Sequence, residues 1–421
     1  MAPIRLAIIG CGGMGHRHLF GLNELRRAGW DDFVLVGACD PVRANADSLA
    51  DQVAAFFGSR PTVVNELDQL AVVGVEAVDV TTTPRSHHTI AAAALGHGWH
   101  AMIEKPAGLT VRAANLIRQA ADASGRVLSV AENYRRDPIN RLAKALLDAG
   151  VIGRPRLLIH HVIDGGDQML ISVWRHQKDQ SGVLIDVGVH FADMIEYLLG
   201  EVASVAAQTR LHEPIRKNPA ADGGTPTANP AGVYGRWQKA MPATFAATAE
   251  DAVYATLLFK SGLVGQYIED HAGHGPNLWA RQIYGSAGSL SLPVDRSGGR
   301  ISLHIAGQGE TPAAGLLDLV PDFRLDAVTA SLFGGERLAE YAFSFAETDR
   351  KLLAVEYADF AGAIRGEHAP EVDAAQGARA VAVAYALLEA GALGRPVTVA
   401  EVLGETVGDY QRSIDQGMGL G

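Results

Sequence analysis

The chain has 421 residues, 48% hydrophobic and 20% charged, with a formal net charge of −11, which allows two or three domains with a sizeable core. The negative charge and the lack of a long basic block argue against nucleic acid or an anionic membrane as a partner. The N-terminus lacks the layout of a signal peptide, and no apolar run is long enough to cross a bilayer. Cys11 and Cys39 are the only cysteines, so we expect no disulfide framework. These features predict a cytoplasmic protein.

The first element is an apolar strand at Ile4–Ile9, followed by the glycine-rich turn GCGGMG and a helical pattern from Met14 to Arg27. Glycines at this spacing make a tight turn, admit a pyrophosphate and let the helix pack against the strand, while the helix N-terminus offers free N–H groups to the phosphates. The turn therefore predicts dinucleotide contacts at Gly10, Gly12, Gly13, Met14 and Gly15.

The second strand, FVLVGACD, ends in Asp40. A carboxylate at this position can accept hydrogen bonds from both adenosine ribose hydroxyls and repels a 2′-phosphate, so it favours NAD over NADP. Arg43, three residues later, is also a candidate cofactor contact because it could pair with a 2′-phosphate. The alternative is that Arg43 begins the next helix and faces solvent.

Strands and helices then alternate through EAVDVTTTP, the helix His87–Leu95, WHAMIE, the helix Thr110–Ser124 and RVLSVAENY. This alternation predicts βαβ crossovers and a parallel, doubly wound Rossmann sheet, in which ligands lie beyond the carboxyl ends of the strands. Thr82, Glu104, Lys105, Glu132 and Asn133 are expected at that edge, and Pro84 and His87 follow at the start of the next helix. The predicted cofactor contacts among them are Thr82, Pro84, His87, Glu104, Lys105 and Asn133. We place this NAD-binding domain at residues 1–133.

Beyond Pro138 the pattern changes to a helix, Ile139–Asp148, and several short strands joined by glycine-containing turns. These strands predict a second α/β domain at residues 134–421 with an open, mostly antiparallel sheet. Residues 214–242 are rich in Pro, Gly, Ala and Asn and are expected to form a long loop, and residues 305–350 show no clear pattern. Two alanine-rich helices close the chain.

One further helix is expected from Ser181 to Gly200, with an apolar stripe on one face. Asp186, His190 and Asp193 lie on its other face; for Asp193 alone a solvent-facing role is preferred. A carboxylate below a histidine orients the imidazole and favours its protonated form, so Asp186 and His190 are a candidate general-base pair. Gly188 between them permits a close approach by another chain segment or a ligand.

Other residues are candidate substrate contacts. Tyr134 and Arg135 end a Rossmann strand, although Arg135 could instead pair with Asp137. Trp174 could stack on a sugar, and Arg175 could bind an anionic group, whereas His176 and Lys178 are expected in a solvated basic loop. His274 is a candidate substrate contact; His271 and His274 are three residues apart, but no further ligand pattern indicates a metal site.

These motifs together resemble the glucose–fructose oxidoreductase and inositol dehydrogenase family. The resemblance rests on the glycine turn Gly10–Gly15, on Glu104-Lys105-Pro106, and on Asp186-Val-Gly188-Val-His190. It implies a nicotinamide-dependent oxidation of a sugar, glycoside or cyclitol, a homodimer or homotetramer, and catalytic roles for Lys105, Asp186 and His190. A base must take the hydroxyl proton and a cation must stabilise the developing alkoxide; His190 with Asp186 would be the base and Lys105 the cation, although Lys105 could itself be the base.

Two other functions fit the same residues. An NAD-dependent glycosidase would oxidise a ring hydroxyl transiently, eliminate the aglycone, add water and reduce the ketone again. A regulatory nucleotide sensor without activity would need neither a lysine nor a histidine at these positions, so the presence of both argues against it.

Overall fold

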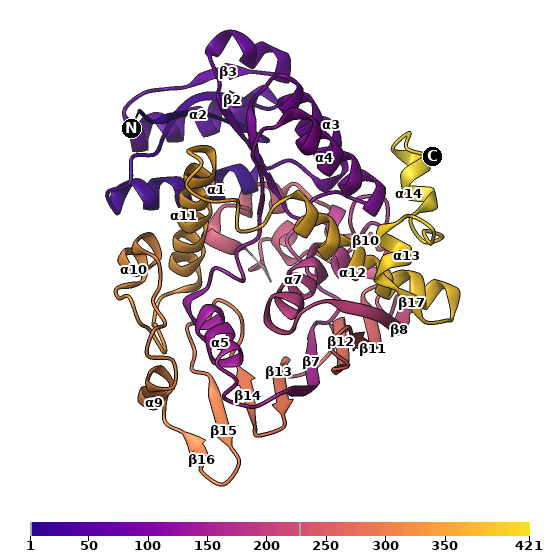
Figure 1. Cartoon of the computed structure of the whole chain (residues 1–421). Coiled ribbons are helices and arrows are strands. Elements are labelled where there is room, and N and C mark those ends of the chain that lie inside the picture. The colour runs from indigo at the N-terminus through magenta and orange to yellow at the C-terminus, as the bar shows by residue number, and fades with distance from the viewer. Residues whose placement is uncertain (1, 227–228) are drawn as a thin grey trace.

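The first sheet of the protein has six parallel strands in the order β3-β2-β1-β4-β5-β6 in a computed structural model that describes residues 2–226 and 229–421 (Figure 1). The strands are β1 (Ile4–Ile9), β2 (Phe33–Cys39), β3 (Thr62–Val64), β4 (Ala77–Val80), β5 (His100–Glu104) and β6 (Leu128–Ala131). This order reverses between β1 and β4, and such a reversal opens a ligand crevice at the carboxyl ends of the strands. The predicted doubly wound Rossmann sheet is confirmed.

Helices cover this sheet because each parallel connection crosses over one of its faces. They are α1 (Gly13–Arg27), α2 (Arg43–Phe57), α3 (Pro84–Gly96) and α4 (Val111–Ser124), with the short 3-10 helix η1 (Leu67–Val73). The strands are almost wholly apolar and buried, as a sheet covered on both faces requires.

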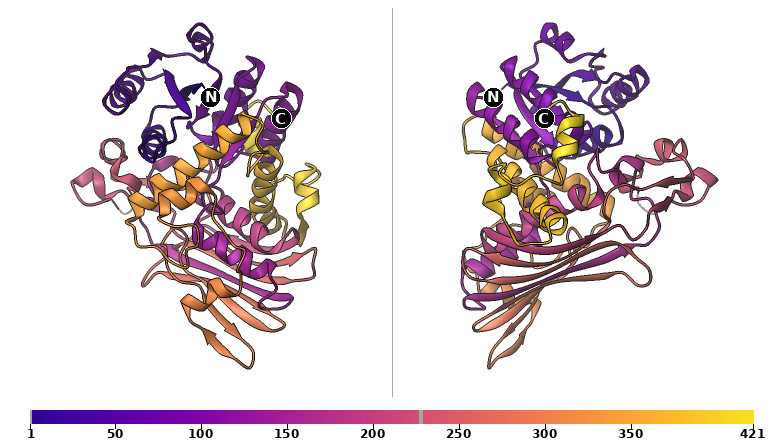
Figure 2. Two further views of the ribbon diagram at one scale, coloured as in Figure 1. Left: turned by 60° about the vertical axis from the view of Figure 1, so that its left-hand side comes forward. Right: turned by 90° about the vertical axis from the view of Figure 1, so that its right-hand side faces the viewer.

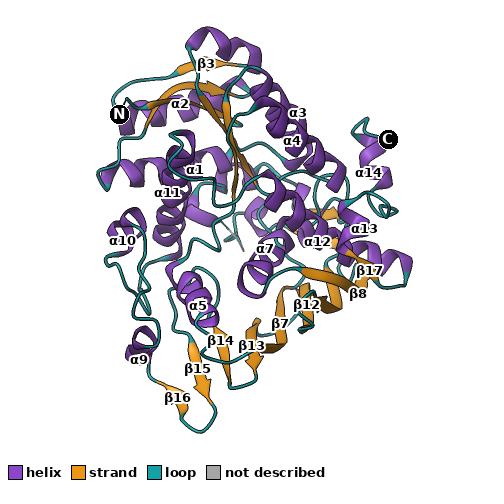
Figure 3. Ribbon diagram, in the orientation of Figure 1, coloured by secondary structure: helices purple, strands orange, loops and turns teal. Residues whose placement is uncertain are grey.

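The second sheet has nine strands in the order β16-β15-β14-β13-β7-β12-β11-β8-β17. They are β7 (Pro155–Gly165), β8 (Val202–Arg210), β11 (Ala252–Phe259), β12 (Val264–Gly273), β13 (Leu278–Gly285), β14 (Gly288–Leu292), β15 (Ser302–Ile305), β16 (Gly309–Thr311) and β17 (Val397–Thr398). Every neighbouring pair is antiparallel except β7 and β12. The predicted open, mostly antiparallel sheet is confirmed, and helices lie between it and the Rossmann domain (Figures 2 and 3).

The helix expected from Ser181 to Gly200 is divided in two at Val187. The pieces are α6 (Val183–Asp186) and α7 (Gly188–Leu199), which follow α5 (Pro138–Asp148) and the 3-10 helix η2 (Val173–His176). At the junction, His190 N donates to the carbonyl of Val187 only three residues earlier. The helix is therefore interrupted at this turn, so Asp186 ends one helix and His190 lies in the next.

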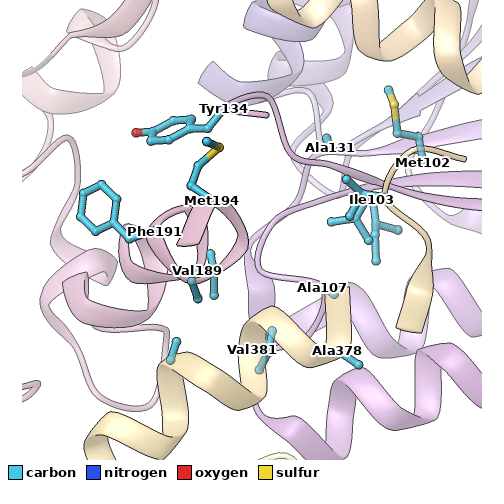
Figure 4. Packing of buried hydrophobic residues seen from close by; sticks show 14 of the residues in the cluster. Met102, Ile103, Ala107, Ala131, Tyr134, Val189, Phe191, Met194, Ala378 and Val381 are labelled. Atoms are coloured by element: carbon cyan, nitrogen blue, oxygen red, sulfur yellow. The ribbon is translucent and has the colours of Figure 1, made fainter. Parts of the chain in front are cut away.

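Two long C-terminal helices return to the Rossmann domain. They are α11 (Phe345–Ile364), which packs on α1, and α12 (Ala374–Leu393), which packs on α4, α7 and β8. Ala378 and Val381 of α12 meet Ile103 of β5 and Val189 of α7 in one continuous apolar core (Figure 4). This core holds α7 in a fixed position against the carboxyl ends of β5 and β6. The chain ends with α13 (Val399–Leu403) and α14 (Arg412–Gly417).

The expected loop 214–242 has secondary structure. Apart from residues 227–228, which lie outside the described part of the chain, it belongs to an arm, residues 211–247, that projects from the second domain (Figure 2). The arm contains β9 (Ile215–Lys217), η3 (Pro219–Asp222), η4 (Pro230–Gly232), α8 (Gly235–Lys239) and β10 (Thr244–Ala246). Its base is fixed by pairing of β9 with β10 and by the backbone bond from Met169 N to Lys217 O.

The unassigned segment 305–350 also has defined elements. Besides the end of β15, β16 and the start of α11, it contains α9 (Ala313–Asp318) and α10 (Ala327–Phe333). None of the helices in residues 2–226 and 229–421 is long and apolar enough to span a membrane.

Candidate active site

A cavity of about 570 Å³ follows the carboxyl edge of the Rossmann sheet from the glycine turn to α6. Nine of the predicted cofactor contacts line it: Gly10, Gly12, Gly13, Met14, Asp40, Thr82, Pro84, Glu104 and Lys105. Trp174, Arg175 and Asp186 line it as well. The fold thus brings the cofactor motif and part of the predicted catalytic set into one space.

The glycine turn has the geometry that a dinucleotide needs. Gly10 has φ +98°, and a Cβ there would lie 2.8 Å from both Thr81 C and Thr82 N. Gly12, by contrast, has no heavy atom within 4 Å of its ideal Cβ position. Gly10 therefore allows β1 to turn beside β4, and Gly12 leaves room for a pyrophosphate at the N-terminus of α1.

Asp40 is held at the rim of the same cavity. Its Oδ2 accepts from Cys11 N at 2.8 Å and its Oδ1 from Val42 N at 2.8 Å. Each carboxylate oxygen keeps a lone pair for a ribose hydroxyl. Arg43 does not line the cavity; its side chain is 59% exposed and bonds Asp47 at 3.0 Å. Arg43 thus takes the solvent-facing alternative, and the residues at the ribose end fit NAD.

Lys105 lies where β5 ends, at the far end of the cavity. Its Nζ donates to the Asp186 carbonyl oxygen at 2.8 Å and to Asp186 Oδ1 at 3.0 Å. Arg175 Nε donates to Asp186 Oδ2 at 2.8 Å. Burial disfavours the charge of Asp186, but Arg175 and Lys105 outweigh that effect and hold its pKa well below its usual range. Asp186 is thus an ionised anchor, and one N–H of Lys105 stays available to a ligand.

His190 has a different partner from the one expected. Its Nδ1 lies 2.7 Å and 2.8 Å from the two carboxylate oxygens of Glu132, directly after β6. The Tyr134 ring stacks on the imidazole, with centroids 4.1 Å apart and planes 1° apart. Asp186 therefore does not orient His190, because the break at Val187 turns the two residues to different partners. Burial, reinforced by Lys105, lowers the pKa of His190 and so favours the neutral ring.

Two predicted roles, on α7 and in the turn after β6, need correction. Asp193 is buried rather than solvent-facing, with 4% exposure, and it binds Arg135, whose Nε donates to Asp193 Oδ2 at 2.8 Å. Asp137 does not pair with Arg135; it caps α5 by accepting from Ile139 N. Because a buried carboxylate needs a partner, Asp193 takes the guanidinium. Arg135 therefore does not line the cavity.

Other predicted residues lie beside or away from the cavity. His87 is fully buried, with Nδ1 2.9 Å from Pro106 O and Nε2 3.2 Å from Thr82 O, so it supports the cofactor loops from below. Asn133 is buried, and its Oδ1 has no hydrogen-bond partner among the described residues. His274 is 65% exposed, bonds Glu213 at 2.9 Å and lies outside the cavity lining.

The basic loop before α6 is largely internal. Trp174 stacks under the Arg175 guanidinium at 4.1 Å, and Arg175 Nη1 donates to Ser172 Oγ at 2.8 Å. His176 is buried rather than solvated, and its Nε2 accepts from Leu170 N at 2.9 Å. Lys178 packs over the ring of Tyr410, with its Nζ 3.7 Å from the ring centroid. The Trp174 indole and the Arg175 guanidinium thus bound the cavity here, and two nitrogens of that guanidinium already donate hydrogen bonds to protein groups.

Sequence reasoning missed the residues that the arm adds to the cavity. Tyr234, Trp237 and Met241 line it from above the glycine turn. Tyr234 lies so close to Gly13 that a Cβ there would be 2.4 Å from its ring. The aromatic residues in an otherwise irregular stretch were a signal for burial, but only the folded arm shows what they cover.

His271 pairs with Asp164 at 2.8 Å and with Glu269 at 2.9 Å. Across residues 2–226 and 229–421, no three His, Cys, Asp or Glu side chains are grouped so as to hold a metal ion.

Comparison with known proteins gives two adjoining family matches. Residues 4–132 match an oxidoreductase family's NAD-binding Rossmann fold, and residues 144–399 match the same family's C-terminal alpha/beta domain. The chain is 28% identical to levoglucosan dehydrogenase of Pseudarthrobacter phenanthrenivorans over 70% of this chain and 75% of that protein. It is 28% identical to scyllo-inositol 2-dehydrogenase (NAD(+)) of Bacillus subtilis, over 49% of this chain and 58% of that protein.

Solved structures share the fold. A levoglucosan dehydrogenase in complex with NADH superimposes with a TM-score of 0.72 at 23% identity, covering 94% of this chain and 99% of the other. The family and the NAD cofactor predicted from the sequence are confirmed by these matches. The domain boundary at residues 133 and 134 and the roles of individual residues stay predictions.

Proposed function

Since this chain belongs to the oxidoreductase family with an NAD-binding Rossmann fold and a C-terminal alpha/beta domain, we propose that it oxidises a secondary alcohol of a sugar, sugar derivative or cyclitol with NAD. One observation carries the proposal: Lys105, bound to Asp186, lines the same cavity as the glycine turn and Asp40. Relatives that act on levoglucosan and scyllo-inositol support the substrate class.

Bound NAD⁺ would supply the acceptor for the hydride that leaves the carbinol carbon. Gly10–Gly15 and the N-terminus of α1 would hold its pyrophosphate, and Asp40 its ribose hydroxyls. Lys105 would donate its free N–H to the oxygen of the reacting alcohol and stabilise the negative charge that develops there. Asp186 keeps that ammonium in place through two bonds.

His190 would take the hydroxyl proton. Its Nδ1 faces Glu132, so a proton on Nδ1 leaves the Nε2 lone pair free to accept. Glu132 would then stabilise the imidazolium that forms, as a buried carboxylate does for a catalytic histidine. This assignment replaces the pair Asp186–His190 by two separate units, Asp186–Lys105 and Glu132–His190.

The substrate would lie against Trp174, whose indole presents an apolar face suited to the C–H face of a sugar ring. An anionic group on the substrate stays a prediction. Arg175 Nη2 has no hydrogen-bond partner among residues 2–226 and 229–421, whereas its Nε and Nη1 already bind Asp186 and Ser172. Arg175→Lys would then raise KM for an anionic sugar more than for its neutral counterpart.

The test is NADH formation by the purified chain with a panel of anhydrosugars, glucosides, aldoses and inositols, each assayed with NAD⁺ and with NADP⁺. Product analysis for aglycone release from the glucosides separates net oxidation from redox-neutral hydrolysis. Lys105→Ala that binds NAD⁺ but does not turn over is the matched control. A panel in which no alcohol reduces NAD⁺ would reject the proposal.

The proposal extends to assembly and location, with a homodimer or homotetramer in the cytoplasm. Strands β11, β12 and β13 of the nine-stranded sheet expose apolar side chains, including Leu258 at 46%, Tyr284 at 41% and Val264 at 38%. Burying these side chains against a second copy would remove them from water. Light scattering of the purified chain measures the oligomeric state, and a monomer would reject this part.

A further inference from the structure

Arg296 lies in the turn after β14 with a backbone conformation that is unfavourable for its residue type. Its φ is +63°, in the left-handed region that side chains with a Cβ rarely adopt. Its N–H donates to Asp137 Oδ2 at 2.9 Å, and Tyr341 donates to the same oxygen at 2.9 Å. The surroundings therefore hold this residue in place, and such positions concentrate at functional sites.

The guanidinium of Arg296 lies between two aromatic rings. Its Cζ is 4.6 Å from the Tyr134 ring centroid and 4.8 Å from that of Phe345. Nη2 donates to Tyr134 Oη at 3.3 Å, and Nη1 donates to Asp349 Oδ1 at 3.3 Å. The side chain is only 15% exposed, so one orientation of the planar group is fixed by contacts on both faces and at its edge.

The column continues from Tyr134 to the proposed base. The Tyr134 ring also stacks on His190, with ring centroids 4.1 Å apart and planes 1° apart. Tyr134 N also donates to Glu132 Oε1 at 3.0 Å, the carboxylate that faces His190 Nδ1. Arg296, Tyr134 and His190 are therefore linked through ring contacts, and Glu132 binds both Tyr134 N and His190 Nδ1.

We propose that Arg296 is a positioning residue for His190. It holds the Tyr134 ring in contact with the imidazole, and its fixed positive charge favours the neutral form of the His190 imidazole. The proposal rests on His190 as the base of the proposed function. It also gives the segment 305–350 a role, because Tyr341, Phe345 and Asp349, which hold Arg296, all belong to that segment.

The charges around His190 support this role. Burial lowers its pKa most, and the positive charges of Lys105 and Arg296 lower it further, whereas Asp186 and Glu104 act in the opposite direction. Glu132 accepts at Nδ1 and favours a proton there. Because Lys105 would contact the substrate oxygen, Arg296 is the positive charge that can be removed without deleting a substrate contact.

The test compares Arg296→Gln and Arg296→Lys, with Arg300→Gln as the matched control. Arg300 is in the same turn region but is 63% exposed and pairs only with Glu340 among the described residues. Two readouts are measured: the acid limb of kcat/KM against pH, and the His190 titration by NMR of histidine-labelled protein, assigned with His190→Gln. The NMR readout does not depend on turnover.

We expect Arg296→Gln to move both the acid limb and the His190 titration to higher pH by about one unit, the effect of one charge at two stacking distances in a partly buried site. Arg296→Lys should keep the limb within about a third of that shift but lower kcat severalfold, because an ammonium does not stack as a planar guanidinium does. Arg300→Gln should change neither.

An unmoved His190 titration in folded Arg296→Gln, or an equal shift in Arg300→Gln, would overturn the proposal. If Arg296→Gln does not fold, wild-type kcat in Arg296→Lys would overturn it. A titration that shifts as expected in a protein that oxidises no sugar would instead reject the proposed function, and with it the catalytic meaning of the contact, while the effect of Arg296 on the His190 proton would stand.

Discussion

Replacing Glu132 by glutamine tests whether His190 is the proton acceptor. The carboxylate of Glu132 lies 2.7–2.8 Å from His190 Nδ1 and is 3% exposed. A hydrogen bond to a charged partner contributes roughly 1.5–3 kcal/mol and a neutral one roughly 0.5–1.5 kcal/mol, so losing the charge removes about 1–1.5 kcal/mol of imidazolium stabilisation. At a pH above about 7, where Glu132 is ionised, this difference alone lowers the rate about five- to fifteenfold.

The glutamine amide can also turn its NH₂ group toward Nδ1 and so favour the tautomer with the proton on Nε2, which cannot act as a base. We therefore expect kcat and kcat/KM to fall by about ten- to a hundredfold, while KM and the Kd for NAD change by less than about twofold. Steady-state kinetics and NADH binding by fluorescence measure these quantities. An unchanged kcat in folded Glu132→Gln would refute the assignment of His190.

The same substitution has an independent effect on stability. Burial raises the pKa of Glu132 to about 7 from 4.5. Because the folded protein then binds the proton more tightly than the unfolded chain, Glu132 lowers stability as pH rises from about 4.5 to about 7. Glutamine lacks this titration, so the unfolding free energy of the variant should gain on wild type across that interval, by at most about 3 kcal/mol.

The N–H of His190 opposes part of this effect, so the gain at pH 8 should lie between zero and that bound. Thermal unfolding at several pH values measures the difference. A variant less stable than wild type at pH 8 would show that the pair is a net stabilising interaction and would refute this reasoning.

Three further outcomes follow from the site. Lys105→Ala should lower kcat at least about a hundredfold with little change in NAD affinity. Because Lys105 and His190 serve one oxygen, kcat of the double variant with His190→Ala should fall by far less than the product of the two single-variant losses. Asp40→Ser should weaken the binding of NAD and strengthen the binding of NADP relative to NAD. If the wild type bound NADP more tightly than NAD, the role proposed for Asp40 would be contradicted. Gly188→Ala should destabilise the protein by about 1–3 kcal/mol in denaturant unfolding, because its Cβ would lie 3.0 Å from Glu269 Oε2.

The Rossmann half was predictable because its signals are local. The turn at Gly10, the acid at Asp40 and the lysine at Lys105 each follow a buried strand, and parallel strands bring their carboxyl ends to one edge. Position along a strand therefore fixed position in space. Arg43 was ambiguous for the same reason: it starts a helix, where the side chain can turn either way, and only Asp47 shows which.

Partners that are distant in the chain were not predictable. Glu132 was visible as an acid after a strand, but its pairing with His190 depends on how α7 packs against β6. Asp193 looked solvent-facing because one helical face was polar, whereas that face meets Arg135. A polar stripe on a helix indicates only that the face meets polar groups. For Asp193, at the junction of the two domains, that group is the Arg135 guanidinium rather than water.

The spacing of Asp186, Gly188 and His190 follows from three separate contacts. Asp186 ends α6 and holds Lys105, which is at the end of β5. Gly188 begins α7, where a side chain would meet the buried carboxylate of Glu269. His190 follows two residues after Gly188 and reaches Glu132. The acid and the histidine are close in sequence because the break at Val187 lets neighbouring residues serve two different strands. That division explains why one short motif can carry both the cation that stabilises an alkoxide and the base that takes its proton.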